Sequence, residues 1–163
     1  MGRVIIVMGV SGSGKSTIGQ LLSKDISLPF FDADNFHPKQ NLDKMTKGIP
    51  LNDNDRLPWL KDLSKHISDW HQGEGAVLAC SALKESYRII LAQSGAPIDW
   101  VYLKGDFETI SKRMKLRKGH FMNYTLLQSQ FDVLEEPMSS IKVSIEDEAP
   151  SIVSSIIYQI KPL

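Results

Sequence analysis

A glycine-rich run near the start of the sequence has the residues and spacing for phosphate chemistry. Residues 9–16 fit G-x-x-x-x-G-K-[ST]; they are Gly9, Val10, Ser11, Gly12, Ser13, Gly14, Lys15 and Ser16. Glycines let the backbone curl so that successive N–H groups converge on phosphate oxygens, and a helix N-terminus adds its positive dipole end. The motif predicts a nucleoside triphosphate site, where Lys15 reaches the β- and γ-phosphates and the Ser16 hydroxyl binds Mg²⁺.

The flanking sequence supports this interpretation over a glycine turn that merely resembles such a loop. Residues 4–8 form an apolar run typical of a buried parallel strand, and residues 17–22 look like the first turns of a helix, with Thr17 completing the phosphate-binding segment. Strand, loop, Lys-Ser pair and helix are therefore in register.

Two acidic residues are expected beside this loop. Residues 30–31 predict a short strand that delivers Asp32 and Asp34 at its carboxyl end, where open α/β sheets bind their ligands. A third strand, residues 76–80, ends in Cys80 instead of the aspartate that many phosphate-loop enzymes use near Mg²⁺. This absence favours Asp32 or Asp34 as the metal-side carboxylate. The alternative, an Asp turn or a helix N-cap, stays open.

Basic residues are candidates for holding an anionic acceptor. Arg56 lies in a polar stretch, residues 36–60, whose Pro, Gly, Asn and Asp content predicts a long functional loop. Its planar guanidinium can pair with a carboxylate, although a salt bridge to Asp53 or Asp55 is the alternative. Asp53, Asn54 and Asp55 could also simply cap the helix that follows. Lys84 and Arg88 are four residues apart, so we expect them to share one helix face at the active edge of the sheet, unless they are simply solvated charges.

A second basic region indicates a lid. The helix expected from near Asp106 becomes basic at its end, and Arg113 and Arg117 are spaced i,i+4 before a loop that contains Gly119. A mobile segment that brings arginines onto transferring phosphates has this pattern, although the charges could only complement the helix dipole.

Strand and helix patterns alternate along the chain without a linker or repeat. This alternation predicts one domain, residues 1–163, with a three-layer α/β/α arrangement of a five-stranded parallel sheet and a lid at about 113–125. Further strands are expected at 98–103 and 141–145. His66 and His71 flank the apolar stripe of a helix and are interpreted as surface residues.

Composition narrows the function class. The 163 residues carry zero formal net charge, so there is no global electrostatic case for nucleic acid or an anionic membrane as partner. Cys80 is the only cysteine, which excludes an intrachain disulfide and a cysteine-based zinc site. We find no long apolar segment and no signal peptide before the first strand, and therefore expect a cytoplasmic protein.

Two classes of phosphate-loop protein compete, a small-molecule kinase and a nucleotide switch. A GTPase is expected to carry Asn-Lys-x-Asp near the fourth strand, and residues 103–106 lack the Asn. Shikimate kinases carry a glycine triplet after the third strand, which residues 80–82 do not match. The pattern favours a kinase of a different small molecule.

Several further blocks resemble gluconate kinase (gluconokinase) of the short phosphate-loop type. They are Asp32-x-Asp34-x-x-His37-Pro38-x-x-Asn41, Lys44-Met45-x-x-Gly48-x-Pro50-Leu51-x-Asp53-x-Asp55-Arg56-x-Pro58-Trp59-Leu60, Cys80-Ser81-Ala82-Leu83-Lys84-x-x-Tyr87-Arg88, Leu103-x-Gly105, Arg117-x-Gly119-His120-Phe121-Met122 and Ser129-Gln130-Phe131-x-x-Leu134-Glu135-x-Pro137. One departure is Ala33, where the family pattern leads us to expect glycine. This matters only if the backbone there needs a positive φ.

The resemblance implies a phosphate-loop kinase fold with a helical lid, and ATP-dependent phosphorylation of the 6-hydroxyl of D-gluconate by a homodimer. On this hypothesis Lys15 and Mg²⁺ neutralise the phosphates, Asp34 orients the hydroxyl and accepts its proton, and Ser16 and Asp32 hold the metal. Arg113 and Arg117 close over the nucleotide. The acceptor-side residues are Asp34, His37, Asn41, Arg56, Lys84, Arg88 and His120. The alternative is a same-fold kinase for another sugar acid or a shikimate-like molecule.

Overall fold

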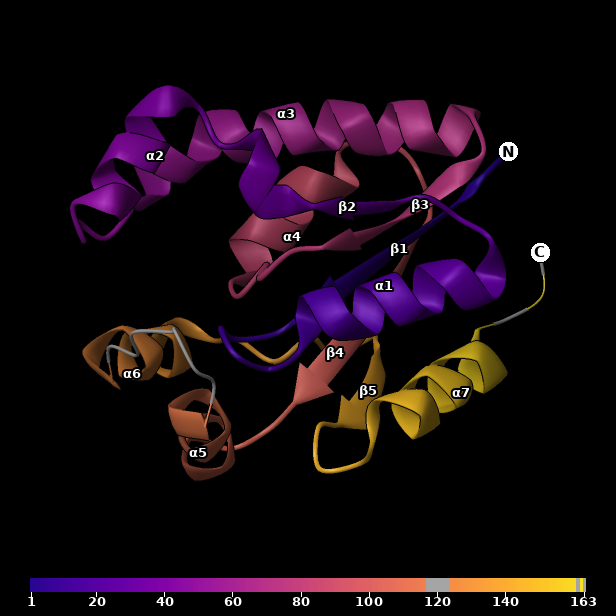
Figure 1. Cartoon of the computed structure of the whole chain (residues 1–163). Helices are drawn as coiled ribbons and strands as arrows, with labels where there is room; N and C mark the ends of the chain where they lie inside the picture. Colours follow the sequence, from indigo (N-terminus) through magenta and orange to yellow (C-terminus); the bar gives the residue numbers. More distant parts are fainter. Residues whose placement is uncertain (117–123, 161, 163) are drawn as a thin grey trace.

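A five-stranded parallel sheet forms the centre of the computed structural model, which describes residues 1–116, 124–160 and 162 (Figure 1). The strands are β1 Arg3–Met8, β2 Phe30–Asp32, β3 Gly75–Ala79, β4 Ile98–Lys104 and β5 Ile141–Ser144. Their order across the sheet is β2-β3-β1-β4-β5, and every neighbouring pair is parallel. The predicted sheet is confirmed, and β1, which leads into the glycine-rich loop, is its middle strand.

Helices cover both faces of this sheet and create the predicted three layers (Figure 1). Helices α1 and α7 pack together on one face, and α3 and α4 pack together on the other. Helices α5 and α6 contact each other near the carboxyl end of β4. The helices are α1 Lys15–Ile26, α2 Lys39–Thr46, α3 Asp53–Gln72, α4 Glu85–Ala92, α5 Phe107–Leu116, α6 Tyr124–Val133 and α7 Ala149–Gln159, and a short 3₁₀ helix, η1, spans Ala33–Phe36.

The alternation of side chains on β1 explains how one strand supports two cores. Ile5 and Val7 belong to the apolar cluster under α1 and α7, whereas Val4, Ile6 and Met8 belong to the cluster under α3 and α4. Successive residues of a strand point to opposite faces, and all five of these side chains are fully buried. The strand is therefore fixed on both sides, and so is the loop that begins at its end.

The prediction of a long loop over residues 36–60 was wrong. Helix α2 occupies most of its first half, and α3 begins at Asp53. The reason is a capping box: Asn52 Oδ1 accepts from the Asp55 N–H at 2.8 Å, and the Asp55 carboxylate accepts from the Asn52 N–H at 3.0 Å. The alternative interpretation, that the Asp and Asn residues here cap the next helix, is confirmed, and they start a 20-residue helix.

His66 and His71 also differ from their prediction as surface residues, because both are half-buried. The His66 ring lies 4.8 Å from the Phe36 ring and 5.7 Å from the Trp70 ring, measured between centroids. His71 Nδ1 lies 2.8 Å from the Gly2 carbonyl oxygen. The helical spacing located the apolar stripe of α3 but not the segments that pack along its flanks.

Across the residues that the structure describes, no helix combines the length and apolar character needed to cross a membrane.

Candidate active site

The glycine-rich loop between β1 and α1 has the geometry of an anion cradle. Gly12 has φ +77°, and a Cβ built there would lie 2.2 Å from Met114 Sδ of α5. Gly14, at the N-cap of α1, has φ +97°. Both positions need glycine, because L side chains avoid this backbone region and Met114 leaves no space at Gly12. The loop thus wraps closely around the N-terminus of α1, where unpaired N–H groups favour anions.

Lys15 is the positive charge of this cradle, and its Nζ donates to the Val10 carbonyl oxygen at 2.9 Å. Burial lowers the pKa of Lys15, and the negative charges of Asp34 and Asp32 act in the opposite direction. Burial raises the pKa of the neighbouring Cys80 thiol to about 12, so this cysteine is a buried, protonated side chain.

Asp32, at the end of β2, caps the short helix η1, as the alternative interpretation expected, and also bonds to Ser16. Its Oδ1 accepts from the Asp34 N–H at 2.9 Å, which caps η1. Its Oδ2 accepts from the Ser16 hydroxyl at 3.2 Å. Neighbouring ligands of an octahedral Mg²⁺, each about 2.1 Å from the ion, lie roughly 3 Å apart, so these two oxygens fit that ion.

Asp34 stands at the mouth of the site. Its side chain is 73% exposed, but the protein around the cleft still removes part of the water near the carboxylate. This desolvation, followed by the negative charge of Asp32, raises the pKa of Asp34. A carboxylate with a raised pKa is a better proton acceptor near neutral pH than an ordinary aspartate.

Alanine is compatible with the backbone at position 33, where the family pattern led us to expect glycine. Among the described non-glycine residues only Ser27 and Ala82 have positive φ, so the Ala33 backbone is not strained. The side chain is buried, and the Ala33 carbonyl accepts from Trp59 Nε1 at 2.8 Å.

His37 and Asn41 form a buried support for Asp34. The His37 ring stacks on the Trp59 ring with centroids 4.2 Å apart, and His37 Nε2 lies 3.7 Å from Asp34 Oδ1. The Asn41 amide lies 3.2 Å from His37 Nδ1 and donates to the Asp55 carbonyl at 2.9 Å. Burial lowers the pKa of His37, which favours a neutral ring. Asn41 is fully buried, so it lies behind His37 and does not reach the surface of the site.

Arg56 and Lys84 come together around Tyr87, a residue that the sequence analysis did not select. Arg56 Nη1 donates to the Leu51 carbonyl at 2.7 Å and to the Tyr87 hydroxyl at 3.3 Å. Tyr87 in turn donates to Asp53, whose carboxylate lies 3.2 Å from Lys84 Nζ. These hydrogen bonds lower the pKa of Asp53.

The alternative interpretation expected Arg56 to form a salt bridge with Asp53 or Asp55, but both carboxylates pair with lysines. Asp53 pairs with Lys84, and Asp55 pairs with Lys44 at 2.8 Å. The sequence signal for Tyr87 was its place in the family block at residues 80–88. Its burial, which makes the hydroxyl need a partner, is visible only in the structure.

Arg88 requires a correction. It was expected to share one helix face with Lys84 at the active edge of the sheet, but Lys84 is the N-cap residue of α4, and Arg88 is only 4% exposed. Its guanidinium donates to the Ala82 carbonyl at 2.6 Å, the Glu135 carbonyl at 2.7 Å and the Glu85 carboxylate at 2.8 Å. Arg88 therefore joins the loop after β3 to the segment after α6. It also holds the backbone of Ala82, whose φ of +43° is unfavourable for alanine.

The predicted lid is only partly within the described residues. Arg113 is exposed in the last turn of α5. Arg117 and His120 lie outside the described residues, as do the other residues of 117–123. One contact here was missed by the sequence analysis: Gln130 Oε1 of α6 accepts from the Ser11 N–H at 2.6 Å.

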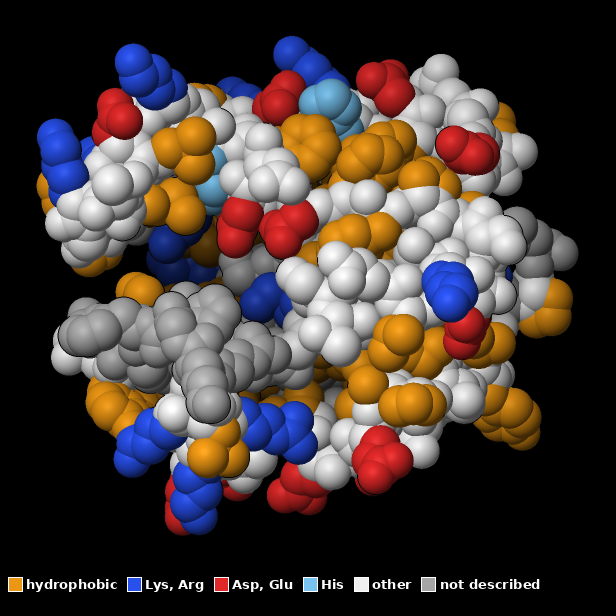
Figure 2. Space-filling view, in the orientation of Figure 1, with side chains coloured by type: hydrophobic (Ala, Val, Ile, Leu, Met, Phe, Trp, Pro, Cys, Tyr) orange, Lys and Arg blue, Asp and Glu red, His pale blue; other side chains and the backbone are white. Residues whose placement is uncertain are grey.

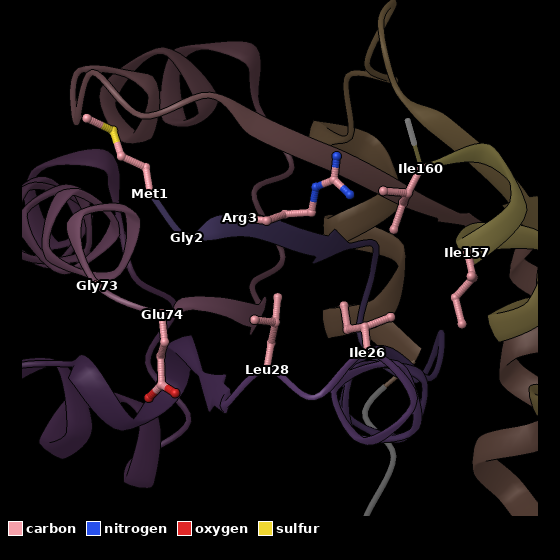
Figure 3. A pocket seen from close by; sticks show the side chains of 9 residues that line it. All are labelled: Met1, Gly2, Arg3, Ile26, Leu28, Gly73, Glu74, Ile157 and Ile160. Atoms are coloured by element: carbon pink, nitrogen blue, oxygen red, sulfur yellow. The ribbon is translucent and has the colours of Figure 1, made fainter. Parts of the chain in front are cut away.

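The surface is hollowed between the α2 and α6 ends of the molecule, with acidic side chains at the rim (Figure 2). A separate cavity of about 440 Å³ lies at the opposite, amino-terminal edge of the sheet, between Arg3, Leu28 and Ile157 (Figure 3). Ligands of such sheets bind at the carboxyl ends of the strands, which favours the hollow beside the phosphate loop.

The comparisons with known proteins agree with this geometry. The sequence pattern of the family described as shikimate kinase matches residues 11–159. A probable gluconokinase of Mus musculus is 44% identical, with 97% of each chain covered. The thermosensitive gluconokinase of Escherichia coli K12 is 47% identical over 85% of this chain and 74% of its own length.

The chain belongs to the gluconokinase family. A crystal structure of a gluconokinase from Sinorhizobium meliloti superposes with a TM-score of 0.88 at 39% identity, covering 96% of this chain and 90% of that one. The chain therefore has the same phosphate-loop kinase fold as that gluconokinase. The match to the shikimate kinase pattern is consistent with this fold.

Replacing Arg88 should destabilise this gluconokinase-family fold. Arg88→Ala leaves the buried Ala82 carbonyl and the partly buried Glu135 carbonyl without this donor and removes the restraint on Ala82, so we expect a loss of about 3 kcal/mol in the free energy of unfolding. Lys84→Ala removes a partly exposed ion pair and should change stability by less than about 1 kcal/mol. Urea unfolding followed by circular dichroism measures both. Equal stability of the two variants would contradict the bracing role of Arg88.

Proposed function

We propose that this chain transfers the γ-phosphoryl group of ATP to the 6-hydroxyl of D-gluconate, giving 6-phospho-D-gluconate and ADP. The observation that carries the proposal is the meeting of two sets of residues at one sheet edge. The phosphate loop with Lys15 lies beside Asp34, and Asp34 connects through His37 to the residues around Arg56. A phosphoryl donor and a sugar-acid acceptor need these two halves in contact.

The nucleotide half is built from backbone and cationic groups. The N–H groups of residues 14–17 at the start of α1 would bind phosphate oxygens, Lys15 would contact the β- and γ-phosphates, and Arg113 would approach from α5. Ser16 and Asp32 would hold Mg²⁺, which when bound neutralises charge on the β- and γ-phosphate oxygens. Ser16 and Asp32 supply only two oxygens, which suits Mg²⁺ because it usually keeps several waters and shares substrate phosphates.

The acceptor half matches the chemistry of gluconate, which has one carboxylate and several hydroxyls. Arg56 and Lys84 would bind the carboxylate, because a guanidinium pairs with it in two parallel hydrogen bonds and an ammonium adds charge. Asp34 would accept from the reacting hydroxyl. His37 and Asn41 would orient Asp34, and Tyr87 would orient Arg56.

The proton of the 6-hydroxyl would pass to Asp34 as the oxygen attacks phosphorus. Its raised pKa suits this task, although positioning supplies most of the catalysis in phosphoryl transfer. His37, next to Asp34, would keep the carboxylate in place, since its buried ring is fixed by Trp59.

We also propose that the active form is a homodimer in the cytoplasm, as in the family that the sequence resembles. Sedimentation equilibrium of the purified chain measures the mass, and a monomer at assay concentrations would contradict the first part.

The direct test is an assay of ADP release with Mg-ATP across D-gluconate, other aldonates, shikimate and nucleoside monophosphates. We expect D-gluconate to give the highest kcat/KM. A clear preference for another aldonate or for shikimate would replace the acceptor. ATP binding without transfer to any of them would instead indicate a regulator.

The role of Asp34 predicts a large effect on kcat. Asp34→Asn should lower kcat by on the order of 100-fold or more, because the amide cannot accept the proton. As the pH is lowered, protonation of Asp34 should reduce the wild-type kcat/KM for gluconate. Since the pKa of Asp34 is raised, this decrease should have its midpoint above about 3.9, the ordinary pKa of an aspartate. The variant should lack this acid limb. Asp43→Asn, an exposed change on α2, is the control, and a near-wild-type kcat for Asp34→Asn would rule out the role.

The role of Arg56 predicts an effect on KM. Arg56→Ala should raise KM for gluconate by roughly 10- to 100-fold, the loss expected for charged hydrogen bonds, with a smaller change in kcat. Arg56→Lys should recover only part of this affinity, because it restores the charge without the planar fork. Lys61→Ala, an exposed change on the same helix, controls for loss of positive charge. An unchanged KM in Arg56→Ala would remove Arg56 from the carboxylate site.

A further inference from the structure

A side chain from α6 reaches the phosphate loop although 119 positions separate them in the sequence. Gln130 Oε1 accepts from the Ser11 N–H at 2.6 Å, a short hydrogen bond in a half-buried place. Figure 1 shows α6 beside the loop that joins β1 to α1. The Ser11 N–H is therefore paired with a side chain rather than with the backbone of the loop.

The opposite side of the same peptide unit binds Lys15. The Val10 carbonyl accepts from Lys15 Nζ at 2.9 Å and from the Ser13 N–H at 3.2 Å, and the Val10 carbonyl and the Ser11 N–H belong to one planar group. No described peptide bond is cis, so this carbonyl and this N–H point in opposite directions. A rotation of the plane that breaks the bond to Gln130 also turns the carbonyl away from Lys15. The two bonds further polarise each other through the amide.

Gln130 is delivered by a helix that is itself firmly held. Leu127 is 1% exposed in the core under α1 and α7, and the Phe131 ring packs edge-on against Phe107 with centroids 5.9 Å apart. The chain after α6 is tied to the loop after β3, because the Glu135 N–H donates to the Leu83 carbonyl at 2.8 Å. The backbone from which the Gln130 side chain extends is therefore fixed.

The residue type also suits this position. A glutamine oxygen accepts a hydrogen bond without carrying charge. A glutamate could accept the same bond but would place a negative charge beside a site for phosphates, and a lysine has no acceptor.

We infer that Gln130 is a positioning residue for phosphoryl transfer, which fixes the Val10–Ser11 peptide and through it the place of the Lys15 ammonium. This inference rests on the proposed kinase function. It extends the transfer site to α6, which would then determine how accurately Lys15 meets the phosphates.

The test compares four variants. Gln130→Met keeps the size of the side chain and removes the acceptor, Gln130→Ala removes both, and Gln130→Glu keeps the acceptor and adds charge. Gln128→Ala is the matched control, because Gln128 is exposed on the same helix and its amide bonds only to Asp132, at 2.8 Å, among the described residues.

In steady-state assays with Mg-ATP and gluconate, we expect Gln130→Met and Gln130→Ala to lower kcat about tenfold, the factor that corresponds to one hydrogen bond. KM for gluconate should stay within twofold. Gln130→Glu should retain most of kcat and raise KM for Mg-ATP several-fold, a split that a purely structural role would not produce. The inference is overturned if the kcat of Gln130→Met matches that of Gln128→Ala, or if Gln130→Glu loses as much kcat as Gln130→Ala.

A second measurement separates this inference from the proposed function. In ¹H–¹⁵N spectra of the chain without ligands, the Ser11 amide proton should move upfield in Gln130→Met and stay in place in Gln128→Ala. If gluconate is the wrong acceptor, this shift still appears, and the kcat ratios are measured with the true acceptor. An unmoved Ser11 resonance would overturn the inference whatever the acceptor.

Discussion

A partly desolvated ammonium at the end of the central strand is the constraint on which this structure depends. Lys15 loses water on folding, which lowers its pKa, and the protein offsets this with the Val10 carbonyl and the nearby charges of Asp34 and Asp32. Those groups come from the loop after β1 and from the end of β2. The position of the cation therefore requires a sheet in which the carboxyl ends of these strands lie at one edge.

The same electrostatic arrangement prepares the site for its ligands. Desolvation and then the negative charge of Asp32 raise the pKa of Asp34, while Asp32 bonds to both Ser16 and the Asp34 backbone. On the proposed function, bound phosphates would add further negative charge beside Lys15 and the N-terminus of α1. The site thus contains charged groups with shifted pKa values, Lys15 and Asp34, a common feature of active sites.

Buried polar side chains outside the ligand contacts hold this arrangement together. Arg88 links the loop after β3 to the segment after α6, and Gln130 links α6 to the phosphate loop. His37, held by Trp59, fixes the acceptor side. Each of these groups connects segments far apart in the chain, so the two halves of the transfer site are joined through α6 as well as through the sheet.

The sequence alone determined those features that depend on neighbouring residues. The phosphate loop, the parallel sheet, the bounds of α1 and the family resemblance all follow from short patterns, since turn sterics and side-chain alternation act over a few residues. The Asn52–Asp55 capping box is equally local, but the sequence left a loop and a helix cap open as alternatives, because the same residue types favour both.

Only the tertiary structure decided what the polar side chains contact. Arg88 and Lys84 have the same spacing whether they are exposed together or separated, and the burial of Arg88 depends on Glu135, 47 residues away. The bond between Ser11 and Gln130 depends on how α6 packs against the core, which no local pattern specifies. Hydrogen bonds between distant segments follow from packing. The sequence therefore predicted which residues can form hydrogen bonds and ion pairs, and the fold determined which of them contact each other.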